Sequence, residues 1–138
     1  MGRYISEENF ESRTIKLNPN QTVKHTHSLI WLHGRAESAF SYKDLFMDET
    51  LAIVPDSCRV VLPTAPTRPV TCNKGKLLTS WYDIITLHRP PTMPLSELLL
   101  LHNQEHIRTS VRSITALIAD EVKSLNGDHT KVFIGGFS

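Results

Sequence analysis

Three short apolar runs along the chain predict β-strands. They cover residues 28–33, 59–62 and 131–134, and glycine or proline follows each of them. Apolar and polar positions do not alternate within these runs, which is typical of strands buried on both faces of a parallel sheet. The pattern therefore favours a sheet that is covered by helices.

The clearest helix is predicted over residues 107–125. Its apolar residues recur at spacings of three and four, and Asn126-Gly127 follows as a C-terminal cap. Ser41 is expected to cap a shorter helix through residues 43–46, and six prolines between residues 63 and 94 predict a long irregular loop. The resulting order of strands and helices indicates an α/β protein with a mostly parallel sheet.

Length and composition narrow the class of protein. A chain of 138 residues suits one domain, so we expect residues 1–138 to form a single domain with a mobile start over residues 1–12. A net charge of +1 argues against nucleic-acid binding. Two cysteines, Cys58 and Cys72, are too few for a disulfide framework and are interpreted as structural thiols. With no apolar run of signal or membrane length, we predict a cytoplasmic protein.

The first residues fit a loose lipidation pattern. Met1-Gly2-x-x-x-Ser6 matches the consensus for N-myristoylation of Gly2. Because the charged Arg3 follows the glycine directly, an ordinary N-terminus is favoured over a lipidated one.

Two turns after predicted strands could carry acyl-transfer chemistry. Gly136-x-Ser138 is the first half of G-x-S-x-G, the turn that lifts a nucleophilic serine above a sheet. After His33-Gly34, the Arg35 amide is placed to stabilise an oxyanion. Ordinary strand-ending glycine turns remain the alternative at both positions.

A third motif suggests a metal site. His102, Glu105 and His106 match H-x-x-E-H, a zinc peptidase pattern. A third ligand is expected from a separate downstream element, and the best candidates, Asp120 and Glu121, belong to the same predicted helix. We therefore favour a solvated helix start over zinc.

Taken together, the motifs resemble one family. Residues 65–71 (APTRPVT), 80–84 (SWYDI) and 135–138 (GGFS) are similar to the acyl-protein thioesterases, in the lysophospholipase/carboxylesterase group of α/β-hydrolases. The likeness runs from about residue 10 to residue 138 and would correspond to a little over half of a typical member. It implies the N-terminal portion of an α/β-hydrolase, truncated at the nucleophile elbow.

The resemblance also implies roles for particular residues. Ser138 matches the nucleophile and the Arg35 amide matches one oxyanion donor, while Trp81, Leu77 and Leu78 match the wall of the acyl-binding cleft. Implied substrates are S-palmitoylated proteins, with lysophospholipids and small esters as secondary ones, and transient contact with a membrane surface. No metal or organic cofactor is implied, and no nucleic acid.

The sequence departs from the family pattern in two ways. Arg35-Ala36-Glu37 stands where the family has Leu-Gly-Asp or a close variant, so Ala36 replaces a glycine. The second elbow glycine, the triad aspartate and the triad histidine would lie beyond residue 138, so we expect the 138-residue chain alone to be inactive and poorly folded. The alternatives are a non-catalytic truncated fragment and a small-ester carboxylesterase.

Overall fold

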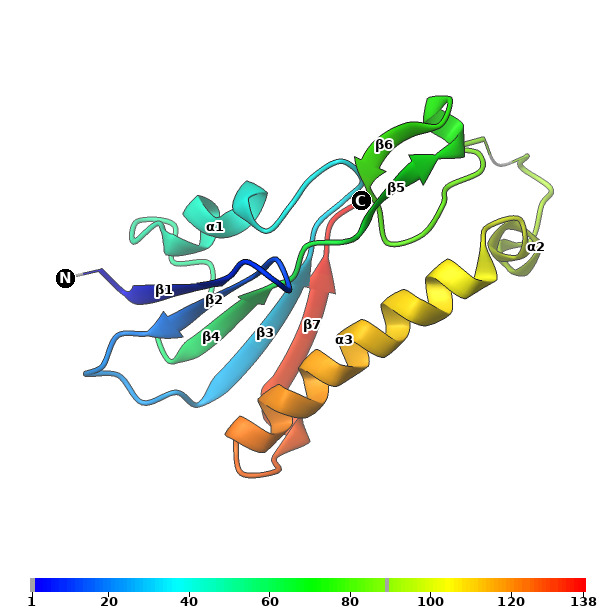
Figure 1. The fold of residues 1–138 in the computed structure, drawn as a ribbon. Helices are drawn as coiled ribbons and strands as arrows, with labels where there is room; N and C mark the ends of the chain where they lie inside the picture. Colours follow the sequence, from blue (N-terminus) through cyan, green and yellow to red (C-terminus); the bar gives the residue numbers. More distant parts are fainter. Residues whose placement is uncertain (1, 89) are drawn as a thin grey trace.

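A mixed five-stranded sheet, in the order β1-β2-β4-β3-β7, organises the computed structural model, which describes residues 2–88 and 90–138 (Figure 1). β3 is parallel to both β4 and β7, whereas β2 is antiparallel to β1 and β4. The strands are β1 (Tyr4–Asn9), β2 (Thr14–Pro19), β3 (His27–Leu32), β4 (Cys58–Leu62) and β7 (Val132–Gly136). β3, β4 and β7 confirm the three predicted strands and their parallel arrangement.

The two N-terminal strands were not predicted, and the expectation of a mobile segment over residues 1–12 is wrong where the structure describes it. β1 pairs with β2 from Tyr4↔Pro19 to Asn9↔Thr14. Ile15 and Leu17 of β2 are buried in the core against α1 (Phe40–Met47). Alternate residues of β2 thus face the core, which is typical of an antiparallel strand that is covered on one face.

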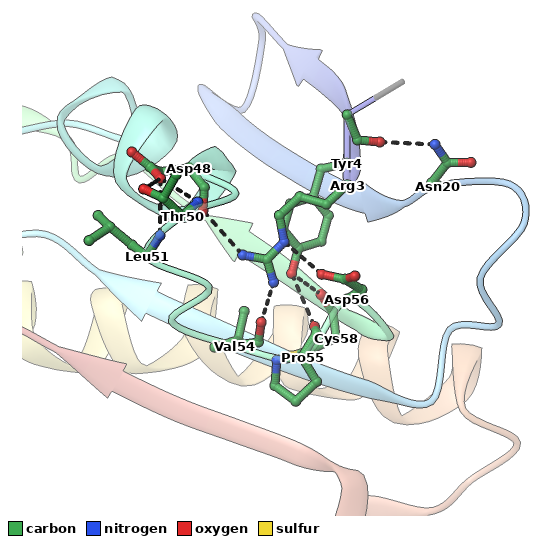
Figure 2. Close-up of polar contacts among 11 residues, drawn as sticks. Arg3, Tyr4, Asn20, Asp48, Thr50, Leu51, Val54, Pro55, Asp56 and Cys58 are labelled. Atoms are coloured by element: carbon green, nitrogen blue, oxygen red, sulfur yellow. Dashed lines mark hydrogen bonds and ion pairs between the residues drawn. The ribbon is translucent and has the colours of Figure 1, made fainter.

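A polar clamp holds the start of β1 in place (Figure 2). The Arg3 guanidinium donates to the Asp56 carboxylate at 2.8 Å and to the carbonyl of Val54. The Tyr4 hydroxyl donates to the Cys58 carbonyl at 2.7 Å, and burial raises the pKa of this phenol to about 12. The N-terminal strand is therefore anchored to the loop that precedes β4.

Helices cover both faces of the sheet. Leu29 and Trp31 of β3 pack into the cluster formed with α1, whereas Ser28 bonds Glu121 of α3 (Gln104–Ser124). Because successive strand residues point to opposite faces, α1 and α3 lie on opposite sides of the sheet (Figure 1). α3 confirms the predicted long helix.

The predicted helix ends are confirmed after α3 and wrong at the start of α1. Asn126 and Gly127 both adopt positive φ after α3, as the predicted cap requires. The predicted cap of the short helix is wrong: α1 begins at Phe40, and the Ser41 hydroxyl, inside its first turn, accepts a hydrogen bond from the Ser38 amide. A further short helix, α2 (Leu95–Leu100), precedes α3.

Part of the proline-rich segment is regular, contrary to the prediction of a loop. β5 (Thr67–Val70) and β6 (Lys76–Thr79) form an antiparallel hairpin around the short 3-10 helix η1 (Thr71–Asn73), and Pro69 lies within β5. In a two-stranded sheet each strand is an edge strand, where proline is tolerated.

β7 is exposed, although the sequence predicted a strand buried on both faces. Phe133 and Ile134 are each 54% exposed. Among the described residues β7 pairs only with β3, so its other edge carries no strand. By contrast Val60, Val61 and Leu62 of the central strand β4 are fully buried.

Candidate active site

A cavity of about 340 Å³ opens where β3 and β7 end. The two strands are parallel neighbours and Leu32 pairs with Gly136, so the turns that follow them lie side by side. His33, Gly34 and Arg35 line the cavity from the first turn, and Ser138 lines it from the second. The structure thus brings together the two turns that the sequence singled out.

The Ser138 backbone is strained at its φ angle. Its φ is 66°, in the left-handed region that disfavours residues other than glycine. Gly34 lies so close that a Cβ added to it would be 3.1 Å from the Ser138 Cβ and from the Phe137 carbonyl oxygen. Because glycine has no Cβ, the chain at Gly34 can lie this close to Ser138.

The turn after β3 is held by Glu37 and by the hairpin. The Glu37 carboxylate accepts a hydrogen bond from the Gly34 amide at 2.7 Å and from the Tyr42 hydroxyl at 2.8 Å. Ala36 adopts a φ of 66° and donates its amide to the Thr79 carbonyl. Within residues 2–88 and 90–138 the Arg35 amide has no hydrogen-bond acceptor, and Arg35 is one of the residues that line the cavity.

The departures from the family pattern are accommodated locally. Ala36 takes the left-handed conformation for which a glycine is better suited. The Arg35 side chain lies over the hairpin, where its guanidinium donates to the Cys72 sulfur at 3.3 Å. Gly34 and Arg35 of this turn line the cavity.

His33 and Trp81 support the turn after β3 through hydrogen bonds. The Ala65 amide donates to His33 Nε2 at 2.9 Å, so the ring proton lies on Nδ1, which donates to the Gly34 carbonyl at 2.7 Å. The Trp81 indole N–H donates to the His33 carbonyl, with the two ring centroids 5.1 Å apart. Burial lowers the pKa of His33. This neutral histidine is a structural part of the site.

Comparison with known proteins identifies the family. Residues 17–138 match the Phospholipase/Carboxylesterase family. The chain belongs to this family. It is similar to acyl-protein thioesterase 1 of Mycosarcoma maydis, with 29% identity over 91% of this chain and 52% of that protein. It is also 32% identical to a probable inactive carboxylesterase of Oryza sativa (80% of this chain, 42% of that protein) and to lysophospholipase-like protein 1 of Mus musculus (85% and 45%).

Solved structures show the same α/β-hydrolase fold. Zea mays acyl-protein thioesterase 2 superposes with a TM-score of 0.67 at 28% identity, over 92% of this chain and 46% of that chain. Arabidopsis thaliana SOBER1 superposes with a TM-score of 0.61 at 26% identity, over 82% and 50%. The chain spans about half the length of the curated relatives it matches. The chain therefore corresponds to part of that α/β-hydrolase fold.

The predicted cleft residues of this family member fall into two groups. Trp81 lines the cavity, but Leu77 and Leu78 lie on β6 and are not among the cavity-lining residues, and Leu77 is 65% exposed. Leu87 and Leu98 line the cavity instead and were missed. The run Leu98–Leu101 was the available signal, but its side chains could not be assigned to a face from sequence alone.

The histidines of the zinc motif have another role. His102 precedes α3 rather than lying on it, and its Nδ1 accepts the Ile85 amide at 3.2 Å. His106 Nδ1 accepts the Asp83 amide at 3.1 Å. In the described part of the chain, no group of three metal-binding side chains comes together. His106 joins the segment after Trp81 to α3, and His102 joins it to the residues just before α3.

The cysteines behave as structural thiols. Cys58 is buried in β4, and burial raises its pKa to about 11, which leaves little nucleophilic thiolate near neutral pH. Cys72 contacts the Arg35 guanidinium.

Over the described residues, no helix is both long and apolar enough to span a bilayer.

Proposed function

We propose that this family member is a serine hydrolase of the acyl-protein thioesterase type. Ser138 would be the nucleophile and the Arg35 amide one oxyanion donor. The proposed substrates are long-chain thioesters of S-palmitoylated proteins, with related lysophospholipid and carboxylic esters. The observation that carries the proposal is the position of Ser138, which has a positive φ, lies against Gly34 and lines the same cavity as Arg35.

The geometry supports attack by Ser138 on an acyl carbonyl. A serine hydroxyl is a weak nucleophile until a neighbouring base takes its proton, and a backbone amide aimed at the cavity stabilises the developing oxyanion. The turn around Arg35 is preorganised to stabilise an oxyanion, because the amides on either side of Arg35 are held in place. The Gly34 amide donates to Glu37, and the Ala36 amide donates to the Thr79 carbonyl.

Neither histidine of the cavity can serve as that base. His33 Nε2 already accepts the Ala65 amide, and His102 Nδ1 accepts the Ile85 amide, which places the proton of a neutral His102 on Nε2. We therefore propose that residues 1–138 do not turn over alone and that the base and its carboxylate partner come from additional polypeptide. In this fold the chain order is nucleophile, acid, histidine.

The cavity walls favour a long apolar acyl group. Trp81 and Tyr82 border both the Ser138 cavity and a second groove of about 440 Å³. The second groove is mainly apolar, with Ile107, Val111 and Ile114 of α3 along it. Apolar surface thus lies beside the serine cavity, on the other side of the two aromatic residues.

The first prediction tests the proposed nucleophile in a completed fold. Residues 1–138 would be joined to the C-terminal half of the maize acyl-protein thioesterase 2 that the chain resembles. We expect the chimera to hydrolyse palmitoyl thioesters faster than acetyl thioesters. Ser138→Ala should lower kcat about 10³-fold or more, because nucleophile and base act as a unit.

Controls separate folding from chemistry. Ser12→Ala, in the exposed turn between β1 and β2, should leave turnover unchanged. Cooperative unfolding of each chimera shows that it has folded. Undiminished turnover in the Ser138→Ala chimera would disprove the assigned nucleophile, and a preference for short esters would favour a carboxylesterase instead.

A further inference from the structure

Arg35 places a positive charge at the edge of the Ser138 cavity, at a position where the family pattern has leucine. Arg35 and Ser138 line the same cavity. The Arg35 guanidinium donates from Nη1 to the Cys72 sulfur at 3.3 Å. The Cys72 amide in turn donates to the carbonyl of Ile84, another cavity-lining residue. The guanidinium therefore lies on the side of the cavity that faces the β5–β6 hairpin.

This guanidinium has no carboxylate partner in the part of the chain that the structure describes. The ion-paired arginines of that part are Arg3, Arg59, Arg108 and Arg112. A guanidinium carries several N–H donors, and its planar fork matches the two oxygens of a carboxylate. The side-chain contact that Arg35 makes there is with a thiol sulfur, which is a weak acceptor. Arg35 thus retains donors for an anion.

The carboxylates nearest to this arginine are engaged elsewhere. The Glu37 carboxylate accepts the Gly34 amide at 2.7 Å. From residue 57 to residue 96 the sequence contains one acidic residue, Asp83. Its carboxylate accepts the amide and the hydroxyl of Thr71 at 2.8 and 2.7 Å. Neither carboxylate forms an ion pair with the Arg35 guanidinium.

Two lysines extend the positive charge along the hairpin. Lys74 and Lys76 are exposed and lie in the same hairpin turn as Cys72, which the Arg35 guanidinium contacts. We call Arg35, Lys74 and Lys76 the basic rim. The hairpin lies beside the C-terminal end of the chain (Figure 1). A polypeptide that approaches Ser138 from the hairpin side therefore meets positive charge first.

The basic rim suits one part of the substrate better than the other. The apolar walls of the site favour the acyl chain, and a charge placed among them would be costly to desolvate. An anionic group on the thiol component of the thioester avoids this cost, because it can lie at the exposed rim. The charge of the rim therefore bears on the leaving group.

The spacing of the charges favours a peptide over a phosphate headgroup. A headgroup concentrates its negative charge at one point, whereas the rim spreads its positive charge over separate side chains on two segments of the chain. An acidic peptide carries carboxylates at successive positions and can pair with several of these cations at once.

We propose that the basic rim selects S-acylated peptides with acidic residues beside the acylated cysteine, and that Arg35 is its main specificity-determining residue. The acyl thioester rests on the proposed function. The preference for acidic residues around it rests on the charges of the rim.

The experiment measures binding to the full 138-residue chain, taken from its monomer fraction. Fluorescent octapeptides carry one S-hexylcysteine, a thioether that cannot be hydrolysed, flanked by glutamates, glutamines or lysines. At low salt, fluorescence anisotropy should show the glutamate peptide binding about tenfold more tightly than the glutamine peptide, and the lysine peptide binding most weakly. This advantage should shrink as the salt concentration rises, because salt screens exposed charges.

A pair of variants assigns the preference to Arg35. Arg35→Met should lower the ratio of the two affinities, glutamate peptide over glutamine peptide, about threefold or more. Lys24→Met removes the same charge in the loop before β3, at the opposite end of that strand from Ser138, and should keep the ratio. Both affinities are measured on one protein, so the ratio does not depend on the fraction folded. The salt dependence of the unmodified chain needs no variant.

Several results would overturn the proposal. They are equal binding of the glutamate and glutamine peptides, no binding of either, and equal effects of Arg35→Met and Lys24→Met. Displacement of the glutamate peptide by glycerophosphate, at a lower concentration than by the same peptide without its hexyl group, would assign the rim to a phosphate headgroup instead.

Failure of this proposal can be told apart from failure of the proposed function. No arm measures hydrolysis, so equal binding of the peptides would leave Ser138 as the proposed nucleophile. An inactive chimera, together with tight binding of the glutamate peptide, would contradict the proposed function and leave the charge preference of the rim in place.

Discussion

Ala36 is the residue with a strained backbone in the turn after β3. Its φ of 66° costs a residue with a Cβ about 1–2 kcal/mol, part of which glycine recovers at the expense of chain entropy. We expect Ala36→Gly to raise the free energy of unfolding by about 0.5–1 kcal/mol. Urea denaturation of the two proteins measures the difference.

A matched substitution shows that the gain comes from the positive φ. Ala119 is exposed within α3. There glycine lowers helix stability by about 1 kcal/mol. If glycine lowered the free energy of unfolding equally at positions 36 and 119, Ala36 would be unstrained.

The buried His33 and the partly buried His25 set the response of stability to pH. Burial lowers the pKa of His33, and burial followed by the charge of Arg59 lowers the pKa of His25, whose other charged neighbours are Glu121 and His27. Protons therefore bind more tightly to the unfolded chain, whose histidines titrate near 6.5. The free energy of unfolding should be at its maximum above about pH 6.5 and fall as the pH drops through and below that value.

Urea denaturation between about pH 7.5 and pH 5.5 measures this fall. His25→Asn should make it smaller, whereas His129→Asn, in the surface turn before β7, should not. A stability that rises on acidification would contradict the assignment.

At the scale of elements, a buried carboxylate connects α3 to the sheet. Glu121 is 2% exposed and accepts hydrogen bonds from the Ser28 hydroxyl of β3 at 2.6 Å and from the Arg59 guanidinium of β4 at 3.2 Å. One helical residue thus ties α3 to two parallel strands.

Glu121→Gln keeps the shape of this side chain but removes the charge that Arg59 faces. We expect the free energy of unfolding to fall by about 1–3 kcal/mol, because buried donors lose their best acceptor. The neighbouring Asp120→Asn, on the exposed side of α3, should change it by less than about 0.5 kcal/mol. Equal effects at the two positions would place Glu121 outside the packing of the helix.

At the scale of the whole molecule, the exposed edge of strand β7 is the feature that we expect to govern self-association. Phe133 and Ile134 point to its two faces, and each borders an apolar groove, of about 320 and 440 Å³. A long, apolar, unpaired strand edge favours pairing with another chain. We expect residues 1–138 to self-associate as concentration rises, in equilibrium with a monomer.

Sedimentation velocity over a range of concentrations tests this expectation. Ile134→Lys should shift the equilibrium to monomer, because a charge on the strand opposes edge pairing. Leu51→Lys, at a similarly exposed position away from β7, should leave the equilibrium unchanged. A monomeric unmodified chain at all concentrations would refute the expectation.

Local patterns were enough to identify several elements from the sequence. Apolar runs identified β3, β4 and β7, and the spacing of apolar residues with its glycine cap identified α3, because each signal lies within one segment. The turns at Gly34 and Ser138 were predicted for the same reason, since glycines directly after a strand mark a sharp turn.

Contacts between distant segments determined the rest. β1 became a strand because β2 and the Arg3 clamp hold it, and Pro69 is tolerated because its hairpin has only edges. Strand order made β4 the buried strand and β7 the exposed one. Folding directed Leu87 and Leu98, rather than Leu77 and Leu78, into the cavity. A segment's own residues determine its local conformation, whereas the burial of a side chain depends on neighbours brought to it from elsewhere in the chain.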